Sequence, residues 1–319
     1  MADRLLVVAW HAVDRTWGYP CRPGAGVRGL ARQLRRLDGV ANVVPLEPAL
    51  DALRSGRPLP TRAVALTFDD GYRDNLTLAV PILEELGLPA TFFLVPAILT
   101  GELRPWWEVL GWAFARATER SVRWDGRLLP TGGRRGRHSV GWATERLKTL
   151  DRAERERRVA ELADLLQPQG RLEERPMFLD WTGARDLVRR GFSIGSHTMR
   201  HAILSRETAE LQAEELAASR RLLEAELDVP VRLLAYPNGR CADYDVTTIR
   251  AAERAGYRYA LTMRPGLNHP TTAPHEVHRV VLEPQQGFCE TAARRVSAKL
   301  SRVTRERLAA AHVPLRGPR

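Results

Sequence analysis

The stretch Leu66-Thr67-Phe68-Asp69-Asp70-Gly71-Tyr72 decides the fold, because an apolar run that begins at Ala63 ends there in two adjacent carboxylates and a glycine. In parallel α/β folds, active sites lie at the carboxyl ends of the strands. Neighbouring residues of a strand point to opposite faces, so two carboxylates can serve one site only if the chain bends, and Gly71 permits a bend. One aspartate can then bind a metal while the other acts beside it. The structural alternative is an Asp-Asp-Gly turn that caps a helix from Asp74.

Apolar runs that resemble this one recur along the chain, with stretches of helical periodicity between them. We expect helices over Asp74–Leu86, which Gly87 would terminate as its C-cap, and over Glu207–Leu227. Alternating strands and helices predict a parallel sheet, either open or closed into a barrel. The predicted strands are Leu5–Trp10, Ala63–Phe68, Ala90–Val95, Phe192–Ser196, Val231–Tyr236, Arg258–Thr262 and Val277–Leu282.

The middle of the chain, residues 101–180, differs in composition from the rest. We interpret it as a helical insertion over the scaffold, with a charged helix over Thr144–Leu166. Tryptophan faces stack on sugar rings, so this segment could form a carbohydrate-binding lid; equally, its tryptophans could pack a small helical subdomain. A chain of 319 residues, 44% of them hydrophobic, is long enough for one barrel with such an insertion. The tryptophans concerned are Trp106, Trp107, Trp112, Trp124 and Trp142.

The chain is strongly basic, with a net charge of +11, and its only lysines are Lys148 and Lys299 among 49 basic residues. Such a charge attracts anionic partners, but so uniform a preference for arginine favours a compositional origin over a designed basic surface. No nucleic-acid recognition module is visible, so no nucleic-acid partner is expected. Three cysteines, Cys21, Cys241 and Cys289, form no disulfide framework, which fits a reducing compartment.

The two ends of the chain bear on location. The apolar run near the N-terminus is too short for a signal peptide, and no stretch is long enough for a transmembrane helix. We therefore expect a cytoplasmic protein, with association with the inner membrane left open. Residues 291–319 carry eight basic side chains against one acid, Glu306, with apolar residues at near-helical spacing. This basic C-terminal tail could lie on an anionic membrane or dock on the domain as a last helix.

A second segment with chemical character is Gly195-Ser196-His197-Thr198-Met199-Arg200-His201, which follows another apolar run. His197 and His201 are four residues apart, so on a helical turn both imidazoles would share one face and could bind a metal. Two histidines and one aspartate leave coordination positions open, as catalytic metal sites require. The HExxH zinc-protease pattern is absent.

Two further strand ends carry candidate groups. In Leu234-Ala235-Tyr236-Pro237-Asn238-Gly239 the Tyr236 N–H could donate to an oxyanion, although an ordinary Pro-Asn-Gly turn explains the segment equally well. His11 stands where the first predicted strand ends. A single histidine is more often structural than functional, but its strand-end position matches that of the other three segments.

Taken in order, these four segments resemble the polysaccharide deacetylase family (carbohydrate esterase family 4, the chitooligosaccharide deacetylase homology domain), from about Leu5 to Leu282. The resemblance implies a distorted (β/α) barrel, here with about seven parallel strands and the tryptophan-rich insertion. It also implies a divalent metal, usually zinc, with Co²⁺, Mn²⁺ or Ni²⁺ as alternatives. By position, the metal ligands are Asp70, His197 and His201, and Asp69 is the general base.

The chain departs from the family pattern at two places. The arginine that usually stands two residues before the proline of the third motif is Ala235 here, and the late Leu-x-His motif that usually supplies the general acid has no clear counterpart. The first strand is similar to a branch of the family in which an N-terminal histidine is the acid. His11 is therefore the first candidate acid and His278 the second, while Arg279 could replace the missing arginine beside Asp69.

The expected activity is metal-dependent hydrolysis of the N-acetyl group of an amino sugar, in a polysaccharide, an oligosaccharide or a lipid- or nucleotide-linked sugar. The alternatives are an O-acetyl esterase or a deformylase acting on a sugar conjugate, and a carbohydrate-binding homologue without activity. Such a homologue would be expected to have lost part of the Asp-His-His set, which this sequence retains. Residues 1–290 would form the deacetylase barrel with its 101–180 insertion, followed by the tail at 291–319.

Overall fold

The structure is a computed structural model, and it describes residues 3–19, 24–172 and 176–283. The basic C-terminal tail at 291–319, Cys21 and Cys289 lie outside the described residues. Cys241 is described and is an exposed free thiol.

The centre of the molecule is a sheet of parallel strands in the order β10-β1-β3-β4-β7-β8-β9. The short β2 (Asn42–Val43) pairs with the first two residues of β3, whereas β4 pairs with its last two. The carboxyl ends of all seven strands therefore meet on one side of the sheet. Their bounds are β1 Leu5–Trp10, β3 Ala63–Phe68, β4 Thr91–Leu94, β7 Ser193–Ser196, β8 Leu233–Ala235, β9 Tyr259–Leu261 and β10 Val280–Val281.

The sheet curls until its two edges are joined by one segment. Val280 and Val281 of β10 pair with β1, while Val277, three residues earlier, forms a parallel bridge with Leu261 of β9. This closure makes the sheet a distorted barrel and confirms the predicted fold. All seven predicted strands are present: β1 and β3 have the predicted bounds, and the others are shorter by one to three residues at their ends.

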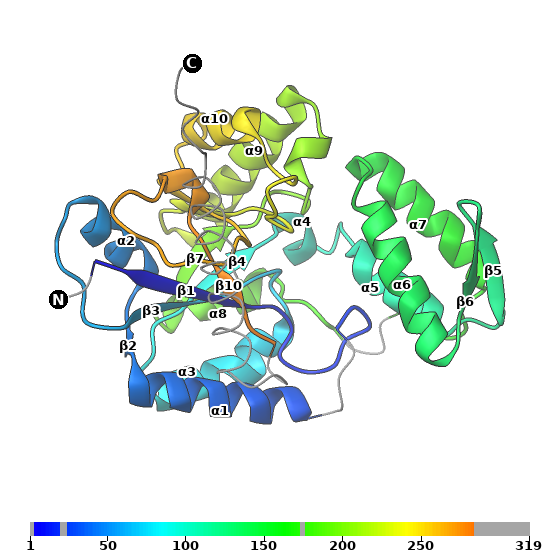
Figure 1. Cartoon of the computed structure of the whole chain (residues 1–319), viewed down its shortest axis with the longest axis horizontal. Coiled ribbons are helices and arrows are strands. Elements are labelled where there is room, and N and C mark those ends of the chain that lie inside the picture. The colour runs from blue at the N-terminus through cyan, green and yellow to red at the C-terminus, as the bar shows by residue number, and fades with distance from the viewer. Residues whose placement is uncertain (1–2, 20–23, 173–175, 284–319) are drawn as a thin grey trace, which may run out of the picture.

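Helices cover the outside of the sheet (Figure 1). The predicted helix Asp74–Leu86 is present, but it begins as a π-helical turn at Asn75–Ala79 and continues as α3 (Val80–Glu85). The predicted helix Glu207–Leu227 is α9. With α9 (Ala209–Leu227), the remaining helical elements of the barrel are α1 (Ala25–Val40), α2 (Leu46–Arg54), α4 (Pro96–Leu99), α8 (Trp181–Arg189), η2 (Leu204–Arg206), α10 (Val246–Arg254) and η3 (Pro274–Glu276).

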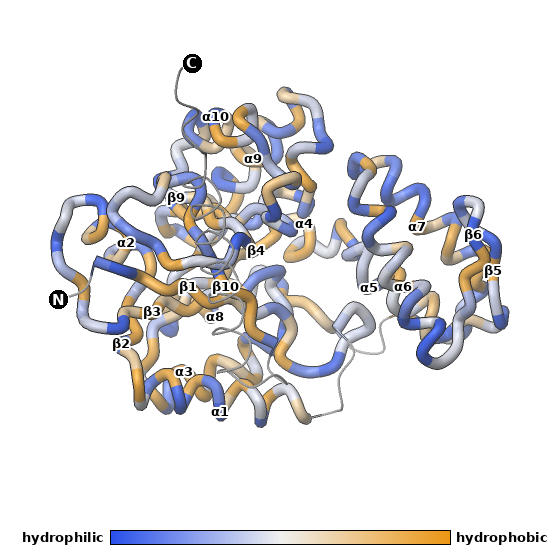
Figure 2. Tube along the Cα trace, viewed as in Figure 1, coloured by the Kyte–Doolittle hydropathy of each residue, from blue (hydrophilic) through white to orange (hydrophobic). Residues whose placement is uncertain are grey.

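Strand alternation divides the barrel core in two. In β3, Val64 and Leu66 pack against the outer helices, whereas Ala63 and Ala65 belong to the cluster inside the barrel. Both faces are buried, which is why these strands read as continuous apolar runs. Figure 2 shows the apolar residues along the central strands, with apolar and polar residues alternating along α1.

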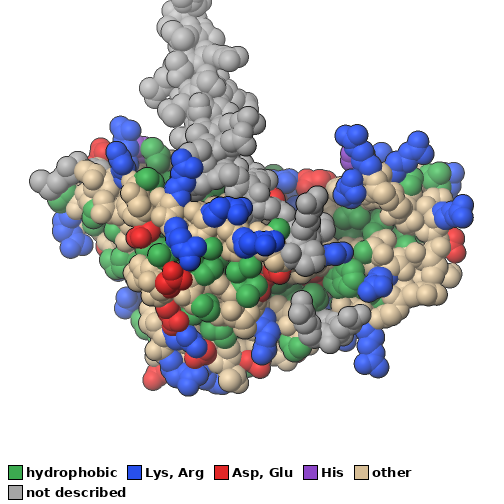
Figure 3. Space-filling view, turned by 90° about the horizontal axis from the view of Figure 1, so that it is seen from below, with side chains coloured by type: hydrophobic (Ala, Val, Ile, Leu, Met, Phe, Trp, Pro, Cys, Tyr) green, Lys and Arg blue, Asp and Glu red, His purple; other side chains and the backbone are tan. Residues whose placement is uncertain are grey.

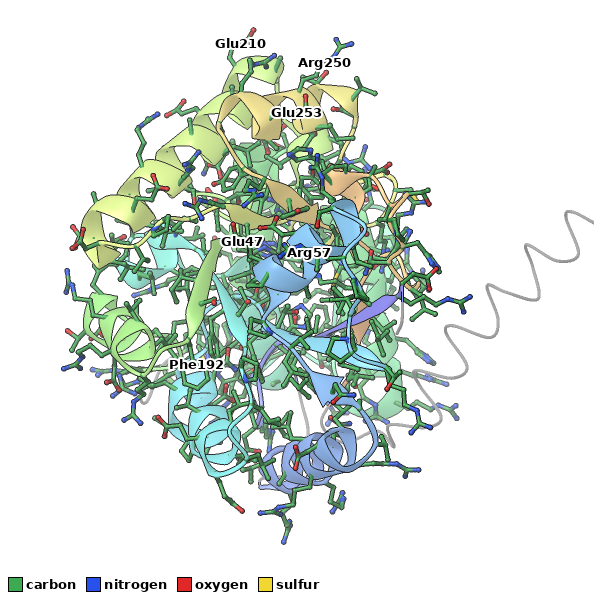
Figure 4. The ribbon with its side chains drawn as sticks, turned by 90° about the vertical axis from the view of Figure 1, so that its left-hand side faces the viewer. Glu47, Arg57, Phe192, Glu210, Arg250 and Glu253 are labelled. Atoms are coloured by element: carbon green, nitrogen blue, oxygen red, sulfur yellow. The ribbon has the colours of Figure 1, made fainter. Side chains whose placement is uncertain are left out.

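The amino-terminal end of the barrel is closed by α2. Leu46, Ala49, Leu50 and Leu53, at the spacing of one helical face, join the interior cluster. Figure 4 looks at this end, with α2 near the middle of the view and Glu47 labelled beside it. Because this end is plugged, the opposite end, where the strands terminate, is the end of the barrel that remains available for a site.

The insertion stands off the carboxyl ends of the strands (Figure 1). It has its own apolar cluster, built from helices and a two-stranded antiparallel hairpin. The single helix predicted over Thr144–Leu166 is wrong: the structure has two helices, because the chain leaves the first one after Leu147 and Asp151 caps the second. The elements are α5 (Trp106–Ala115), β5 (Ser121–Trp124), β6 (Arg127–Pro130), α6 (Gly133–Leu147) and α7 (Arg152–Leu166).

The five insertion tryptophans fall into two groups. Trp112, Trp124 and Trp142 pack in or against the apolar cluster of the insertion. Trp106 and Trp107 also contact that cluster, but in addition they line the cavity that faces the barrel. The packing interpretation therefore holds for these side chains, while carbohydrate binding stays a prediction for Trp106 and Trp107, which line the cavity.

None of the helices in the described part of the chain combines the length and the apolar character that crossing a membrane requires. The basic side chains are scattered over the described part of the face in Figure 3, and acidic side chains lie among them in places. This distribution agrees with a compositional origin for the positive charge.

The N-terminal loop and the insertion touch at Gly111 of α5. A Cβ added there would lie 2.3 Å from the backbone oxygen of Trp17. We expect Gly111→Ala to lower the free energy of unfolding by about 1–3 kcal/mol, because the backbone must move apart. Gly141 of α6 is a matched helical control with nothing within 4 Å. Gly141→Ala should raise stability by about 0.5–1 kcal/mol. Equal effects of the two substitutions in urea unfolding would contradict this close approach.

Candidate active site

The two aspartates after β3 point in different directions because the backbone turns sharply between them. Asp69 continues the inward alternation of Ala63 and Ala65 and is 1% exposed. Asp70 and Gly71 both have φ near +74°, the left-handed region. The bend that the sequence placed at Gly71 therefore already begins at Asp70. A non-glycine residue in this conformation costs free energy and is concentrated at functional sites.

The histidine pair follows β7, but the expected helical turn is absent. Residues 197–203 are irregular, and Thr198 and His201 have φ of 65° and 54°. The prediction that His197 and His201 share a helical face is therefore wrong in its geometry. The two rings nevertheless meet, with centroids 4.8 Å apart, because the left-handed residues fold the loop back on itself.

Asp70, His197 and His201 converge with candidate ligand atoms that all lie within 4.8 Å of one another. The Nε2 atoms of His197 and His201 lie 3.4 and 3.3 Å from Asp70 Oδ1. All three side chains are buried. Asp70 follows β3, and both histidines belong to the loop after β7, so the barrel brings the ends of two strands together.

The chemistry of this group fits a divalent cation. His197 Nδ1 lies 2.7 Å from the backbone oxygen of Ala235, which can only accept, so Nδ1 carries the proton. In the neutral imidazole Nε2 then presents a lone pair toward Asp70 Oδ1, which has no donor of its own. A carboxylate oxygen and imidazole nitrogens that face one another without a donor are a set that Zn²⁺ binds, and a carbonyl that fixes the imidazole tautomer is typical of such sites.

The charges of these groups depend on burial and on one another. Burial raises the pKa of Asp70, but the neighbouring His197 and His201 imidazoles outweigh it and hold that pKa well below its usual range. Burial lowers the pKa of His201 to about 4, so this imidazole is neutral near pH 7 and free to act as a ligand. Burial also lowers the pKa of His197, but Asp70 and Asp69 more than reverse the change.

Asp69 is held by Arg279 inside the barrel. Arg279 Nη1 donates to Asp69 Oδ1 at 2.8 Å, and neither side chain is exposed by more than 1%. Arg279 also donates from Nε to the Thr262 backbone oxygen at 3.2 Å, and its guanidinium lies over the Phe93 ring. Burial raises the pKa of Asp69, but Arg279, followed by the His197 and His11 charges, lowers it overall. Asp69 is therefore an ionised carboxylate beside the Asp-His-His group.

His11 lines the same cavity from the end of β1. Its ring stacks on Tyr19, with centroids 5.4 Å apart. The loop after it is fixed from the barrel side by Asp74, whose Oδ2 accepts from the N–H groups of Val13 and Asp14 at 2.8 Å. His278, the second candidate acid, is not among the residues that line the cavity; its ring lies against Gly266.

The Tyr236 N–H is not available to an oxyanion. It donates to the Leu261 backbone oxygen at 3.0 Å within the sheet, which corrects the prediction for this group. Two residues on, Asn238 also lines the cavity, and its N–H makes no hydrogen bond to any described residue. Asn238 has φ +57°, and asparagine tolerates this region better than most residues do. The N–H of Asn238 in the Pro-Asn-Gly turn is therefore a backbone donor beside the cavity that has no acceptor among the described residues.

The cavity has a volume of about 480 Å³ and lies between the barrel and the insertion. Tyr19, Trp106 and Trp107 give it aromatic surface near the Asp-His-His group. Arg240 of the barrel and Lys148, the residue that follows α6, are linked through Glu145, at 2.7 and 3.2 Å. Polar groups at the base and aromatic faces above are typical of a sugar-binding pocket.

Comparison with known proteins places this arrangement in a family. The family model of polysaccharide deacetylases matches residues 56–260, more than half of the chain. The chain belongs to the polysaccharide deacetylase family. The match begins before β3 and ends in β9, so it includes Asp69, Asp70 and both histidines of the site.

Two curated relatives are similar in sequence. A putative polysaccharide deacetylase of Bacillus subtilis, YxkH, is 23% identical over 247 residues, which are 77% of this chain and 61% of YxkH. The poly-beta-1,6-N-acetyl-D-glucosamine N-deacetylase of Escherichia coli is 50% identical over 88 residues, 27% of this chain and 13% of that protein. The chain thus matches less than two thirds of the length of either relative.

Solved structures of the family share the fold. The Streptococcus pyogenes deacetylase PplD aligns over 88% of this chain and 93% of its own, with a TM-score of 0.58 and 17% identity. IcaB from Ammonifex degensii aligns over 89% and 95%, with a TM-score of 0.56 and 21% identity. At these identities the likeness shows the fold alone.

Several residues of the site had no signal in the sequence. Tyr19 lines the cavity from the N-terminal loop, and Glu108 of the insertion accepts hydrogen bonds from that loop without lining the cavity itself; neither belongs to a strand-end motif. Asn238 stood inside a motif but as a turn residue. Trp106 and Trp107 were singled out in the sequence, through the concentration of tryptophans in the insertion.

The half-buried Asp74 makes the stability of this region dependent on pH. Burial raises the pKa of Asp74 to about 7, although the N–H groups of Val13 and Asp14 lower it. An unfolded aspartate ionises near 3.9, so folding becomes less favourable as pH rises from about 4 to 7. The difference between the two values corresponds to about 4 kcal/mol as an order of magnitude. We expect Asp74→Asn to remove this dependence.

The measurement is urea unfolding of wild type and Asp74→Asn at pH 5 and pH 8. Relative to the variant, the wild type should lose stability between the two values. Parallel behaviour of the two proteins would show that Asp74 is ionised throughout and that burial does not control it.

Proposed function

We propose that the protein is a metal-dependent hydrolase that removes N-acetyl groups from an amino-sugar substrate. The observation that supports this most is the buried convergence of Asp70, His197 and His201 beside an Arg279-paired Asp69, at the carboxyl end of the barrel. A member of the polysaccharide deacetylase family with this set intact has ligands for a metal and a separate carboxylate for proton transfer.

Asp70, His197 and His201 would hold the metal, with zinc as the first choice for one carboxylate and two imidazoles. A divalent ion bound there polarises the acetyl carbonyl and lowers the pKa of water. Everything else in the reaction then falls to groups of this chain. They must take a proton from water, give one to the amine and bind the oxyanion.

We assign the role of the base to Asp69. Arg279 keeps its carboxylate ionised, and Oδ1 is the atom that Arg279 occupies, which leaves Oδ2 for the attacking water. The buried pair also fixes the orientation of the carboxylate. The N–H of Asn238 is the donor that we assign to the oxyanion, because it lies in the cavity wall and has no other partner among the described residues.

We assign to His11 the role of the acid that protonates the departing amine. It lines the cavity with Asp69 and Asp70, whereas the ring of His278 does not. Aromatic faces of Trp106, Trp107 and Tyr19 would bind the sugar ring. The substrate is thus a carbohydrate, and the stacking surface is the part of the site that selects it.

Removing the base should separate chemistry from metal binding. We expect Asp69→Asn to lower kcat for acetate release from N-acetylglucosamine oligomers by at least about 100-fold, because no carboxylate takes the proton. Metal content, measured by elemental analysis of the purified protein, should stay near one per chain. Activity near that of the wild type would overturn the base assignment.

Removing a metal ligand, unlike removing the base, should lower the metal content. His201→Ala is expected to lose bound Zn²⁺, because only two protein ligands remain. Elemental analysis after dialysis is the measurement, and the exposed Glu154, which pairs only with neighbours on α7, supplies the control Glu154→Gln with unchanged metal. Full metal content in His201→Ala would show that the ligand set is different.

The two candidate acids can be told apart by substitution. We expect His11→Ala to lower turnover of the N-acetyl substrate by about 100-fold or more and His278→Ala to leave it within about threefold of wild type. Steady-state kinetics with both variants at one pH is sufficient. The opposite pattern would assign the proton to His278.

A further inference from the structure

We propose that Glu108, on helix α5 of the insertion, is a positioning residue for His11. It would hold the N-terminal loop so that His11 and its stacking partner Tyr19 keep their places in the cavity. This role rests on the proposed function of His11 as the acid. It makes the insertion part of the catalytic site and not only a cover for it.

Glu108 is fully buried and uses both carboxylate oxygens on the loop. Oε2 accepts from the N–H groups of Trp17 and Gly18, both at 2.9 Å. Oε1 accepts from the Thr16 hydroxyl at 2.8 Å. Three donors from three consecutive residues thus converge on one carboxylate. These hydrogen bonds fix the position of the loop backbone relative to α5.

Contacts within the loop connect Glu108 to His11 through Thr16 and Tyr19. The Thr16 hydroxyl that donates to Glu108 also accepts from the Tyr19 N–H at 2.9 Å, and the Thr16 N–H donates to the Tyr19 backbone oxygen at 3.2 Å. The Tyr19 ring then stacks on His11. A shift of Thr16 would move Tyr19, and with it the surface against which the His11 imidazole lies.

Glu108 is itself fixed to the metal side of the site. Tyr72, two residues after Asp70, donates from its hydroxyl to Glu108 Oε1 at 2.7 Å and accepts from Trp107 Nε1 at 2.7 Å. The Trp107 ring contacts the His201 ring, with centroids 4.5 Å apart. The carboxylate therefore ties the loop of the acid to the strand end of Asp70 and to the wall beside His201.

A buried carboxylate at this place is unfavourable by itself. Burial raises the pKa of Glu108, while the hydrogen bonds from Tyr72, Gly18 and Thr16 oppose that change. Glutamine would fill the same volume, but one of its two terminal atoms only donates, so it cannot accept from the loop at both ends. A carboxylate is therefore required at this position despite the free-energy cost of burying it.

The test uses a double-mutant cycle of Glu108→Gln and His11→Ala, with two substrates. On an N-acetyl sugar, whose amine must be protonated to leave, Glu108→Gln should lower kcat by about 10- to 100-fold with metal content unchanged. On p-nitrophenyl acetate, whose leaving group needs no proton, the loss should be below about threefold. Because both substitutions act on one step, the double variant should be no slower than His11→Ala alone.

Asp125→Asn is the matched control, since Asp125 also accepts two hydrogen bonds, but from Arg146 and Arg158 of the insertion and not from the N-terminal loop. It should leave both activities unchanged. Thr16→Val breaks only the hydroxyl link from Glu108 to Tyr19 and should give the same substrate-dependent pattern. It replaces Glu108→Gln in the cycle if that variant does not fold.

The outcomes separate the two proposals. Equal losses on both substrates, or additive losses in the cycle, would overturn the positioning role while His11 keeps its assignment. Full activity of His11→Ala on the N-acetyl sugar would overturn the acid assignment and the role of Glu108 with it. Loss on the N-acetyl sugar alone, without additivity, is the result that the structure predicts.

Discussion

The ion pair between Arg279 and Asp69 is the interaction on which the site depends. Two opposite charges, neither more than 1% exposed, lie inside the barrel 2.8 Å apart. Burying either charge alone would cost several kcal/mol, so each requires the other. The pair joins the segment after β9 to the end of β3, across the sheet that must close for them to meet. Arg279 can therefore keep Asp69 ionised only when the barrel is closed.

The same end of the barrel holds the residues of the Asp-His-His group in conformations that a relaxed chain avoids. Asp70 and His201 both lie in the left-handed region. Packing and hydrogen bonds of the surrounding structure, such as that of His197 Nδ1 with Ala235, offset the free-energy cost of these backbone conformations. The insertion adds Trp107 against His201 and Glu108 against the N-terminal loop. The site is therefore built jointly by strand ends, a loop and an inserted subdomain.

Much of this could be read from the sequence, for a physical reason. Strands buried on both faces, such as β1 and β3, appear as unbroken apolar runs, and polar residues at their ends mark the active end of a barrel. β2, with two residues, is too short to give such a signal. The geometry of His197 and His201 escaped prediction because left-handed residues other than glycine carry no pattern. The helix break after Leu147 was missed for a similar reason, since no proline marks it.

The oxyanion donor shows a further limit of sequence reasoning. Whether a backbone N–H is free depends on strand pairing: the N–H of Tyr236 donates to Leu261, while that of Asn238 has no acceptor among the residues that the structure describes. Glu108 had no signal because its partners are backbone groups about 90 residues away in sequence. Contacts between segments this far apart in the sequence form only once the barrel has closed, so no local sequence pattern predicts them. Strand-end motifs locate the centre of the site but not the groups that hold it in place.

The measurement that tests the central claim most directly is acetate release from N-acetylglucosamine oligomers before and after metal removal. The protein should lose activity on chelation and regain it in proportion to added Zn²⁺, with a break at one equivalent per chain. Unchanged acetate release after the metal has been removed to well below one equivalent would contradict the account.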